Sequence, residues 1–157
     1  MSGKYLSKNE LEIWQRLQTV TESLRREVGR GLKQDAGLSE AEFVVLAHLM
    51  DAGGAARPSE CAESIGWDSS RLAHQLGRLE RRGLVRRAPE HEGDGRASTA
   101  SLTDAGYRAH RKAVGPHLRA AKRWFADALT DAQLSALGEA LTAIEDNAAR
   151  AAKEKDK

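Results

Sequence analysis

The stretch Ser69–Val85, SSRLAHQLGRLERRGLV, decides the fold of this chain. Leu72, Leu76 and Leu79 recur at steps of four and three residues, which places them on one face of a helix. The polar side of the same helix carries several arginines and one acid, Glu80. A helix that touches only water would mix its charges more evenly, so this face is expected to have a partner.

The composition of the chain predicts a mainly helical protein with one core. The 157 residues are 40% hydrophobic and 31% charged, which supports a core and argues against disorder. A formal net charge of only +2 means that any basic function must come from local clusters such as residues 69–85. A single cysteine allows no intrachain disulfide, and the N-terminus MSGKYLSKNE is polar. We therefore expect a cytoplasmic protein without a membrane partner.

Three serine or threonine residues, each followed three positions later by Glu or Gln, predict three helix starts through capping boxes. The pairs are Ser7 with Glu10, Ser39 with Glu42 and Thr130 with Gln133. The first helix should run from about residue 8 into the thirties, and the second from residue 40 to about 50. Thr103 should cap another long helix, which Gly115-Pro116 interrupts, because proline removes an amide.

A helix-turn-helix followed by a wing is predicted in the middle of the chain. A short helix follows Arg57-Pro58 and ends at Gly66, and after a tight turn the helix of the opening stretch runs to Gly83. Residues 84–87 form a β-like run, 91–95 are turn-rich, and 96–102 can return as the partner strand.

In this order the parts resemble the MarR family of winged helix-turn-helix regulators, over nearly the whole chain. The resemblance is carried by RPSECAESIGWDSSRLAHQLGRLERRGLVRR, residues 57–87, and by DGRASTASLTDAG, residues 94–106. The second segment is similar to the family's wing signature, an Asp-x-Arg that leads into Leu-Thr and a helix. Cys61 and Trp67 stand where the family commonly has leucine, and both remain apolar.

The resemblance implies a mainly α fold in which a winged helix-turn-helix lobe is joined to dimerisation helices. The corresponding segments are an N-terminal dimerisation helix (1–36), the DNA-binding lobe (37–103), the C-terminal dimerisation helices (104–150) and a flexible tail (151–157). The implied function is a sequence-specific transcriptional regulator, a dimeric repressor that a small ligand releases.

DNA contacts follow from the way in which a recognition helix enters the major groove. Its first exposed side chains meet base edges, and basic groups farther along meet phosphates. The base-reading candidates are Ser70, Arg71, His74 and Gln75, with Arg71 suited to guanine and Gln75 to adenine. The phosphate candidates are Ser69, Arg78, Arg81 and Arg82. The alternative is a solvated face whose late basic residues favour the helix dipole.

In the wing, the resemblance implies that Arg96 enters the minor groove and that Asp94 orients it or the turn. The alternative is an Arg96–Asp94 salt bridge without DNA contact. The first and last helices resemble the family's dimerisation region, and their apolar stripes agree with that role. The resemblance therefore implies a homodimer on an inverted repeat of double-stranded DNA, with half-sites about 10 base pairs apart. Alternatively, the two stripes close against each other within one chain. The last stripe consists of Leu134, Leu137, Leu141, Ile144 and Ala148.

The resemblance also implies a pocket for a small phenolic or aromatic effector between the dimerisation helices and the lobe. The candidate lining residues are Trp14, Val44, His48, Val114 and His117, each of which also has an ordinary core explanation. Urate is disfavoured as the effector. The urate-responsive branch of the family is expected to carry an aspartate beside the aromatic residue near the start of the second helix, whereas here Val44 follows Phe43.

Other function classes lack support in the sequence. Cys61 could sense oxidants, but it occupies a leucine-like position and is expected to be a buried, inert thiol. His48, His110 and His117 could bind a metal, but no tight ligand cluster surrounds them, so no metal is expected. The sequence contains no recognised catalytic motif, so we expect that the protein is not an enzyme and binds no cofactor. A helical adaptor without DNA affinity would have acidic residues on the face of residues 69–82, where only Glu80 is acidic.

Overall fold

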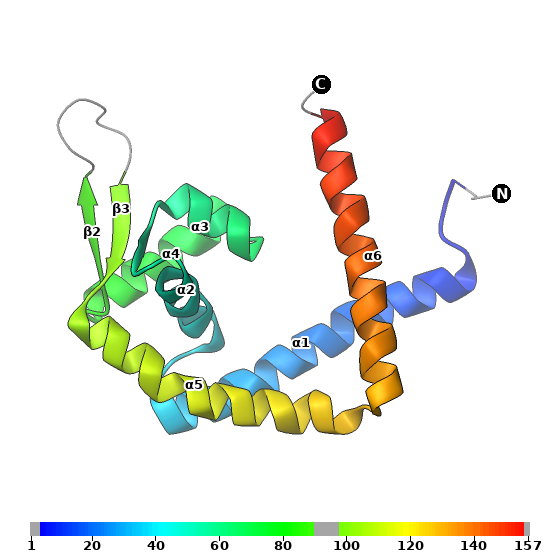
Figure 1. Ribbon diagram of the computed structural model, residues 1–157, viewed down its shortest axis with the longest axis horizontal. Coiled ribbons are helices and arrows are strands. Elements are labelled where there is room, and N and C mark those ends of the chain that lie inside the picture. The colour runs from blue at the N-terminus through cyan, green and yellow to red at the C-terminus, as the bar shows by residue number, and fades with distance from the viewer. Residues whose placement is uncertain (1–3, 90–97, 156–157) are drawn as a thin grey trace. The chain divides into compact units, whose positions relative to one another are not determined.

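A computed structural model describes residues 4–89 and 98–155 of the chain. The fold is mainly helical with one small sheet, as predicted (Figure 1). The elements in order are α1 (Lys8–Ala36), α2 (Glu40–Asp51), β1 (Ala55–Ala56), α3 (Pro58–Ile65), α4 (Ser69–Arg81), β2 (Val85–Pro89), β3 (Ser98–Leu102), α5 (Asp104–Trp124), the short 3-10 helix η1 (Ala126–Ala128) and α6 (Asp131–Lys155). The chain divides into two compact units, residues 1–120 and 121–157.

The three predicted capping boxes begin α1, α2 and α6. In α2, the backbone N–H of Ser39 donates to the Glu42 carboxylate at 2.9 Å, and the Glu42 N–H donates to the Ser39 hydroxyl at 3.1 Å. The Ser7–Glu10 and Thr130–Gln133 pairs make the same reciprocal bonds. These side chains satisfy amides that the first turn of a helix leaves unpaired, which explains why the starts were readable from the sequence.

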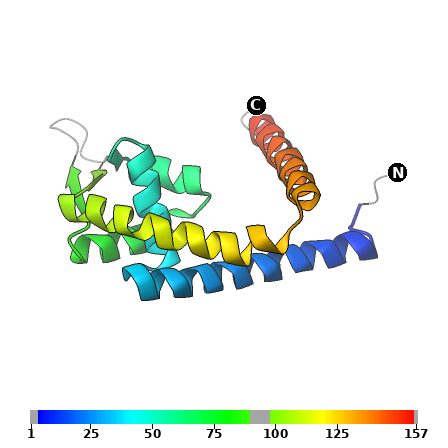
Figure 2. The same ribbon diagram turned by 60° about the horizontal axis from the view of Figure 1, so that its bottom comes forward.

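The core of the first unit lies among α2, α3, α4 and the sheet, which together we call the lobe. Leu72, Leu76 and Leu79 of α4 are buried, as their spacing predicted. The other large side chains that are fully buried include Leu32, Leu38, Val45, Leu46 and Leu49. The C-terminal half of α1 lies beside α5, where Gly31 approaches Ala120 (Figure 2). The N-terminal half of α1 extends away from the lobe (Figures 1 and 2).

The sheet has the strand order β1-β3-β2, and both pairs are antiparallel. Val85 pairs with Leu102 and Arg87 with Ala100, so the predicted wing strands are confirmed in residues 85–89 and 98–102. Strand β1 was not predicted, because two alanines carry no strand signal. It follows Gly54, which has a φ of +102°. The carbonyl of Gly54 accepts a hydrogen bond from the N–H of Leu102 at 2.8 Å. Asp94 and Arg96 lie outside the described residues.

One predicted interruption is wrong, and one helix reaches farther along the chain than its expected segment. Helix α5 is not interrupted at Gly115-Pro116 but continues to Trp124. Proline removes one amide, and here the helix tolerates that loss while packing Ala113 into the core. Helix α6 continues through Lys155, into the segment 151–157 that the sequence assigned to a flexible tail. Among the described residues, no helix combines the length and apolar character that a membrane crossing requires.

Candidate DNA-binding surface

Helix α4 is held on the lobe by its buried leucines and begins at a capped turn. The carboxylate of Asp68 accepts from the N–H of Arg71 at 2.8 Å, which makes Asp68 the N-cap of the helix. At the other end, Gly83 adopts φ +70°, the left-handed conformation that favours glycine after a helix. The helix therefore presents a fixed set of side chains away from the core.

One stripe of α4 faces directly away from the buried leucines. At about 100° per residue, the positions opposite the leucines are 70, 74, 77 and 81. Ser70, His74 and Arg81 at these positions are exposed, and Gly77 leaves the middle of the stripe without a side chain. We call these four residues the outward stripe. Ser69 is also exposed, at the first position of the helix.

A second stripe, which consists of Arg71, Gln75, Arg78 and Arg82, lies on one flank of α4 and is engaged with the protein itself. The Arg71 guanidinium lies 4.0 Å from the centre of the Trp67 ring. Gln75 is half-buried, and its Oε1 is buried without a hydrogen-bond partner among the described residues. Gln75 is thus less free to contact DNA than the outward stripe is, whereas the stacked Arg71 keeps the N–H donors at its edge.

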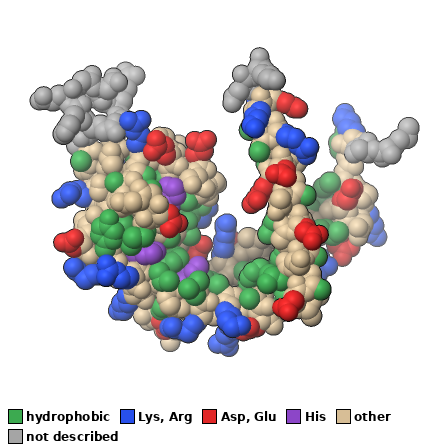
Figure 3. Space-filling model, in the orientation of Figure 1, with side chains coloured by type: hydrophobic (Ala, Val, Ile, Leu, Met, Phe, Trp, Pro, Cys, Tyr) green, Lys and Arg blue, Asp and Glu red, His purple; other side chains and the backbone are tan. Residues whose placement is uncertain are grey.

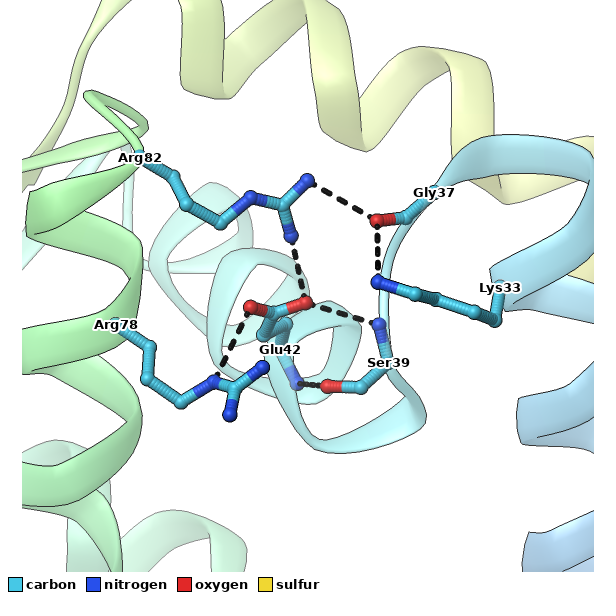
Figure 4. Close-up of polar contacts among 6 residues, drawn as sticks. All are labelled: Lys33, Gly37, Ser39, Glu42, Arg78 and Arg82. Carbon is cyan, nitrogen blue, oxygen red and sulfur yellow. Dashed lines mark hydrogen bonds and ion pairs between the residues drawn. The ribbon is translucent and has the colours of Figure 1, made fainter.

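Arg78 and Arg82 reach from α4 toward Glu42 of α2 (Figure 4). Arg82 donates to Oε2 of Glu42 at 2.7 Å and to the carbonyl of Gly37 at 3.0 Å. Nε of Arg78 lies 3.6 Å from Oε1 of Glu42. Lys33 donates to the same Gly37 carbonyl at 3.4 Å. These contacts join the C-terminal half of α4 to the N-terminus of α2 and to the connection that precedes it.

Glu42 is fully buried, yet it is stabilised as a carboxylate. Burial by itself raises its pKa, but the N–H of Ser39, the Arg82 hydrogen bond and the charges of Arg82 and Arg78 together hold the pKa below its ordinary value. From the sequence, Glu42 is predicted only as a capping-box residue, and both arginines are predicted to contact phosphates. The structure gives both arginines an internal anion, Glu42, and this sequence-distant pairing carries no local signal.

The wing strand adds two basic residues that the sequence analysis did not include in the site. Arg87 of β2 donates to Glu80 of α4 at 3.0 Å, which ties the strand to the recognition helix. Arg86 is exposed on the same strand. An exposed arginine next to a recognition helix carries the charge and reach that a phosphate contact needs. The two consecutive arginines in the predicted strand were the available signal.

The effector-pocket candidates are only partly brought together. The Phe43 ring of α2 stacks on His117 of α5, with 4.3 Å between centroids, and on His110 at 5.5 Å. Histidines lie among hydrophobic side chains on this face of the lobe (Figure 3). Val44, His48 and Val114 are half-buried on the same two helices. Trp14 is 52% exposed, in the half of α1 that extends away from the lobe.

Burial shifts the pKa values of two histidines in this region and of Cys61. Burial lowers the pKa of His110 and of His117, against the smaller opposing effects of Asp51 and Glu40. Nδ1 of His110 is buried without a hydrogen-bond partner among the described residues. Burial raises the pKa of Cys61 to about 11, and the thiol is buried as predicted. Within residues 4–89 and 98–155, no three His, Cys, Asp or Glu side chains group closely enough to hold a metal.

Comparison with known proteins points to one family. The model for the MarR family matches residues 36–97. The chain is 37% identical to the HTH-type transcriptional regulator PecS of Dickeya dadantii (strain 3937) over 83 aligned residues. The aligned residues make up 52% of this chain and 49% of PecS. The chain thus spans about half the length of this curated relative.

Solved structures extend the similarity to most of the chain. Sco3205, a MarR family transcriptional regulator from Streptomyces coelicolor solved in complex with DNA, matches with a TM-score of 0.81 and 29% identity over 93% of this chain and 91% of Sco3205. AbsC, a MarR family transcriptional regulator from the same organism, matches with a TM-score of 0.78 and 30% identity over 92% of this chain and 97% of AbsC.

Proposed function

This chain belongs to the MarR family of transcriptional regulators, and from that premise we propose that it binds operator DNA through the outward stripe of α4 and the wing. The observation that carries the proposal is the exposure of Ser70, His74 and Arg81 opposite the leucines that fix α4 on the lobe. A helix held in this way can enter the major groove without reorganising the core. The DNA complex of Sco3205, 29% identical to this chain, supports the same partner.

Within this surface we assign different roles to the two stripes. Ser70 and His74 read base edges, while Ser69, Arg81 and Arg86 contact phosphates. Arg78 and Arg82 support the helix from inside through Glu42. Arg96, outside the described residues, keeps its sequence-based assignment to the minor groove, and Asp94, also outside them, keeps its assignment to orienting Arg96 or the wing turn.

We further propose that two copies of the chain bind an inverted repeat. Leu11, Trp14 and Leu17 follow one another at steps of three residues along α1 and are each more than two-fifths exposed. On α6, Leu134, Leu141 and Ile144 are exposed to a similar degree. Large apolar side chains in such stripes are stabilised by a second copy that covers them. One lobe on each copy then reads one half-site.

For the effector, we propose a small phenolic or aromatic ligand that binds beside Phe43 and relieves repression. The stacked rings of Phe43 and His117 provide an aromatic wall, and the unpaired Nδ1 of His110 provides a polar atom for a phenol hydroxyl. Ligand binding here would act between α2 and α5 and so change the geometry of the lobes in a dimer. We assign no catalytic residue and no cofactor to the chain.

The DNA proposal is tested with a duplex selected by the protein from a random-sequence library. Affinity is measured by fluorescence anisotropy for this duplex and for a scrambled one, at several salt concentrations. His74→Ala should reduce the preference between the two duplexes. Arg81→Ala should weaken binding to both and lower the salt slope by about 1. Arg111→Ala, an exposed arginine on α5, is the control and should change neither. Equal wild-type affinity for both duplexes would contradict the proposal.

A further inference from the structure

Trp67 and Arg71 form a stacked pair at the start of the recognition helix. The guanidinium carbon lies 4.0 Å from the centre of the indole ring, well within the range of a cation–π contact. Trp67 itself is fixed. It follows Gly66, whose φ of +69° ends α3, and its N–H donates to the carbonyl of Ala62 at 2.9 Å. Its ring is half-buried against the core of the lobe.

The main chain of Arg71 is held as firmly as its side chain. Its N–H donates to the Asp68 carboxylate at 2.8 Å, in the cap of α4. Two consecutive residues of the turn therefore hold Arg71: Trp67 contacts its guanidinium, and Asp68 accepts a hydrogen bond from its backbone N–H. An arginine normally loses much rotamer freedom when it binds, and one that is already ordered loses less.

The kind of contact separates Arg71 from the other arginines on its flank. Arg78 and Arg82 direct their N–H groups to the Glu42 carboxylate. An aromatic ring instead covers the face of a guanidinium and leaves the N–H donors at its edge available. Arg71 is thus ordered and keeps its hydrogen-bonding capacity, at the end of α4 whose side chains reach base edges.

We propose that Trp67 is a positioning residue that holds Arg71 for bidentate recognition of a guanine in each half-site. Guanine presents O6 and N7 as adjacent acceptors in the major groove, which match the fork of an ordered guanidinium. The inference rests on the proposed function, because it requires α4 to enter the major groove. It assigns a specificity role to a side chain that the sequence analysis treated only as an apolar replacement for leucine.

The test compares Trp67→Leu, Trp67→Phe and Arg71→Ala in the full chain. Anisotropy is measured on the library-selected duplex and on duplexes in which each guanine of the half-site is replaced in turn. Arg71→Ala should remove the preference at one guanine. Trp67→Leu should weaken binding to the selected duplex by about tenfold and reduce the preference at that same guanine, with an unchanged salt slope. Trp67→Phe, which keeps an aromatic face, should retain part of the preference.

A double-mutant cycle distinguishes positioning from a general structural effect. In the Arg71→Ala background, Trp67→Leu should have little further effect on DNA affinity, since the residue that it positions is gone. Circular dichroism melts identify any variant that is simply unfolded, and Trp67→Phe then carries the test. The inference is overturned if Trp67→Leu and Trp67→Phe, both folded, keep the full guanine preference, or if their effects add to that of Arg71→Ala. Failure of the proposed function looks different, because the wild-type protein would then prefer no selected duplex.

Discussion

Arg82, the C-cap residue of α4, donates a hydrogen bond to the buried carboxylate of Glu42 on α2 across 2.7 Å. The same guanidinium bonds the carbonyl of Gly37 at the end of α1, so one side chain connects three helices (Figure 4). Arg78 adds a second positive charge at 3.6 Å. The orientation of the recognition helix on the lobe therefore depends on an acid that lies far from it in sequence.

Glu42→Gln should destabilise the protein by about 2 kcal/mol. Removal of one partner from a buried, hydrogen-bonded ion pair commonly costs roughly 3–5 kcal/mol, and the partial exposure of Arg78 and Arg82 reduces that figure here. The amide retains some of the capping geometry but carries no charge to compensate the two arginines. The measurement is the free energy of unfolding from urea denaturation at pH 7.

Glu10→Gln is a matched control for this change. Glu10 occupies the same capping-box position in α1, bonded to Ser7, but it is exposed and contacts no arginine in the structure described. Its substitution should have a much smaller effect than that of Glu42. Equal losses of stability in the two variants would mean that the capping box, and not the pair of arginines, accounts for the role of Glu42.

These contacts show which parts of the fold could be predicted from the sequence. Helix starts and the buried face of α4 depend on residues three or four apart, so local pattern was sufficient for Ser39 with Glu42 and for the leucines of α4. The partners of Arg78 and Arg82 depend on packing between α2 and α4, and no local spacing reveals that. For the same reason the exposed residues of α4 were divided by their order along the helix, early ones for base edges and late ones for phosphates, whereas the structure separates an outward stripe from a flank that contacts the protein itself.

Strand β1 and helix α5 illustrate the other limit. Ala55 and Ala56 are extended because β3 offers them an edge, and their own strand propensity is low. Pro116 lies within a helix because tertiary packing outweighs the loss of one backbone hydrogen bond. In both cases the tertiary environment overrides the local preference. The stacking of Arg71 on Trp67 is likewise a tertiary fact, although the four-residue spacing of the two was visible.

Stability should fall as the pH is lowered below about 6.5. Burial beside Phe43 lowers the pKa of His110 and of His117 in the folded state, so the unfolded chain takes up protons at a higher pH than the folded chain does. The neutral histidines therefore contribute their full stabilisation when the pH is above the pKa that they have in the unfolded chain. That contribution is lost as the pH falls from there through the lower pKa values of the folded protein. Asp51 and Glu40 oppose this effect in part.

Urea midpoints between pH 5 and pH 8 test this expectation. Variants with His110→Gln and His117→Gln should show a flatter dependence on pH than the wild-type chain. His74→Gln, which changes an exposed histidine of the outward stripe, should leave the dependence as it is in the wild type. If the double variant lost stability on acidification as steeply as the wild type, the two half-buried histidines would not be the source of the pH dependence.

Leu17→Asp should weaken the proposed dimer. A carboxylate placed in the apolar stripe of α1 would have to be desolvated when a second copy covers Leu11 and Trp14. Sedimentation velocity over a range of protein concentrations should show a shift toward monomer. Thr19→Asp introduces the same charge at an exposed position on the opposite side of α1 and should leave the association unchanged. A dimer equally stable in both variants would place the interface elsewhere.

Gly77→Ala should separate the stability of the lobe from its affinity for DNA. A Cβ at Gly77 would meet only side-chain nitrogens, at 3.6 Å from Arg81 and 3.9 Å from Arg87, which is ordinary contact. Because alanine favours a helix over glycine by about 1 kcal/mol, the variant should be more stable by roughly 0.5–1 kcal/mol. The same methyl group stands in the middle of the outward stripe, so it should hinder close approach to DNA and reduce the affinity for the selected duplex.

Gly138→Ala provides the control for the helix effect alone. Gly138 is an exposed position in α6, and a Cβ there meets nothing within 4 Å. This variant should gain stability in thermal melts without any change in DNA affinity. Gly77 has no structural need for glycine in the free protein, since its backbone is helical and its surroundings admit a methyl group. If Gly77→Ala bound the selected duplex as tightly as Gly138→Ala does, the outward stripe would not be the surface that approaches DNA.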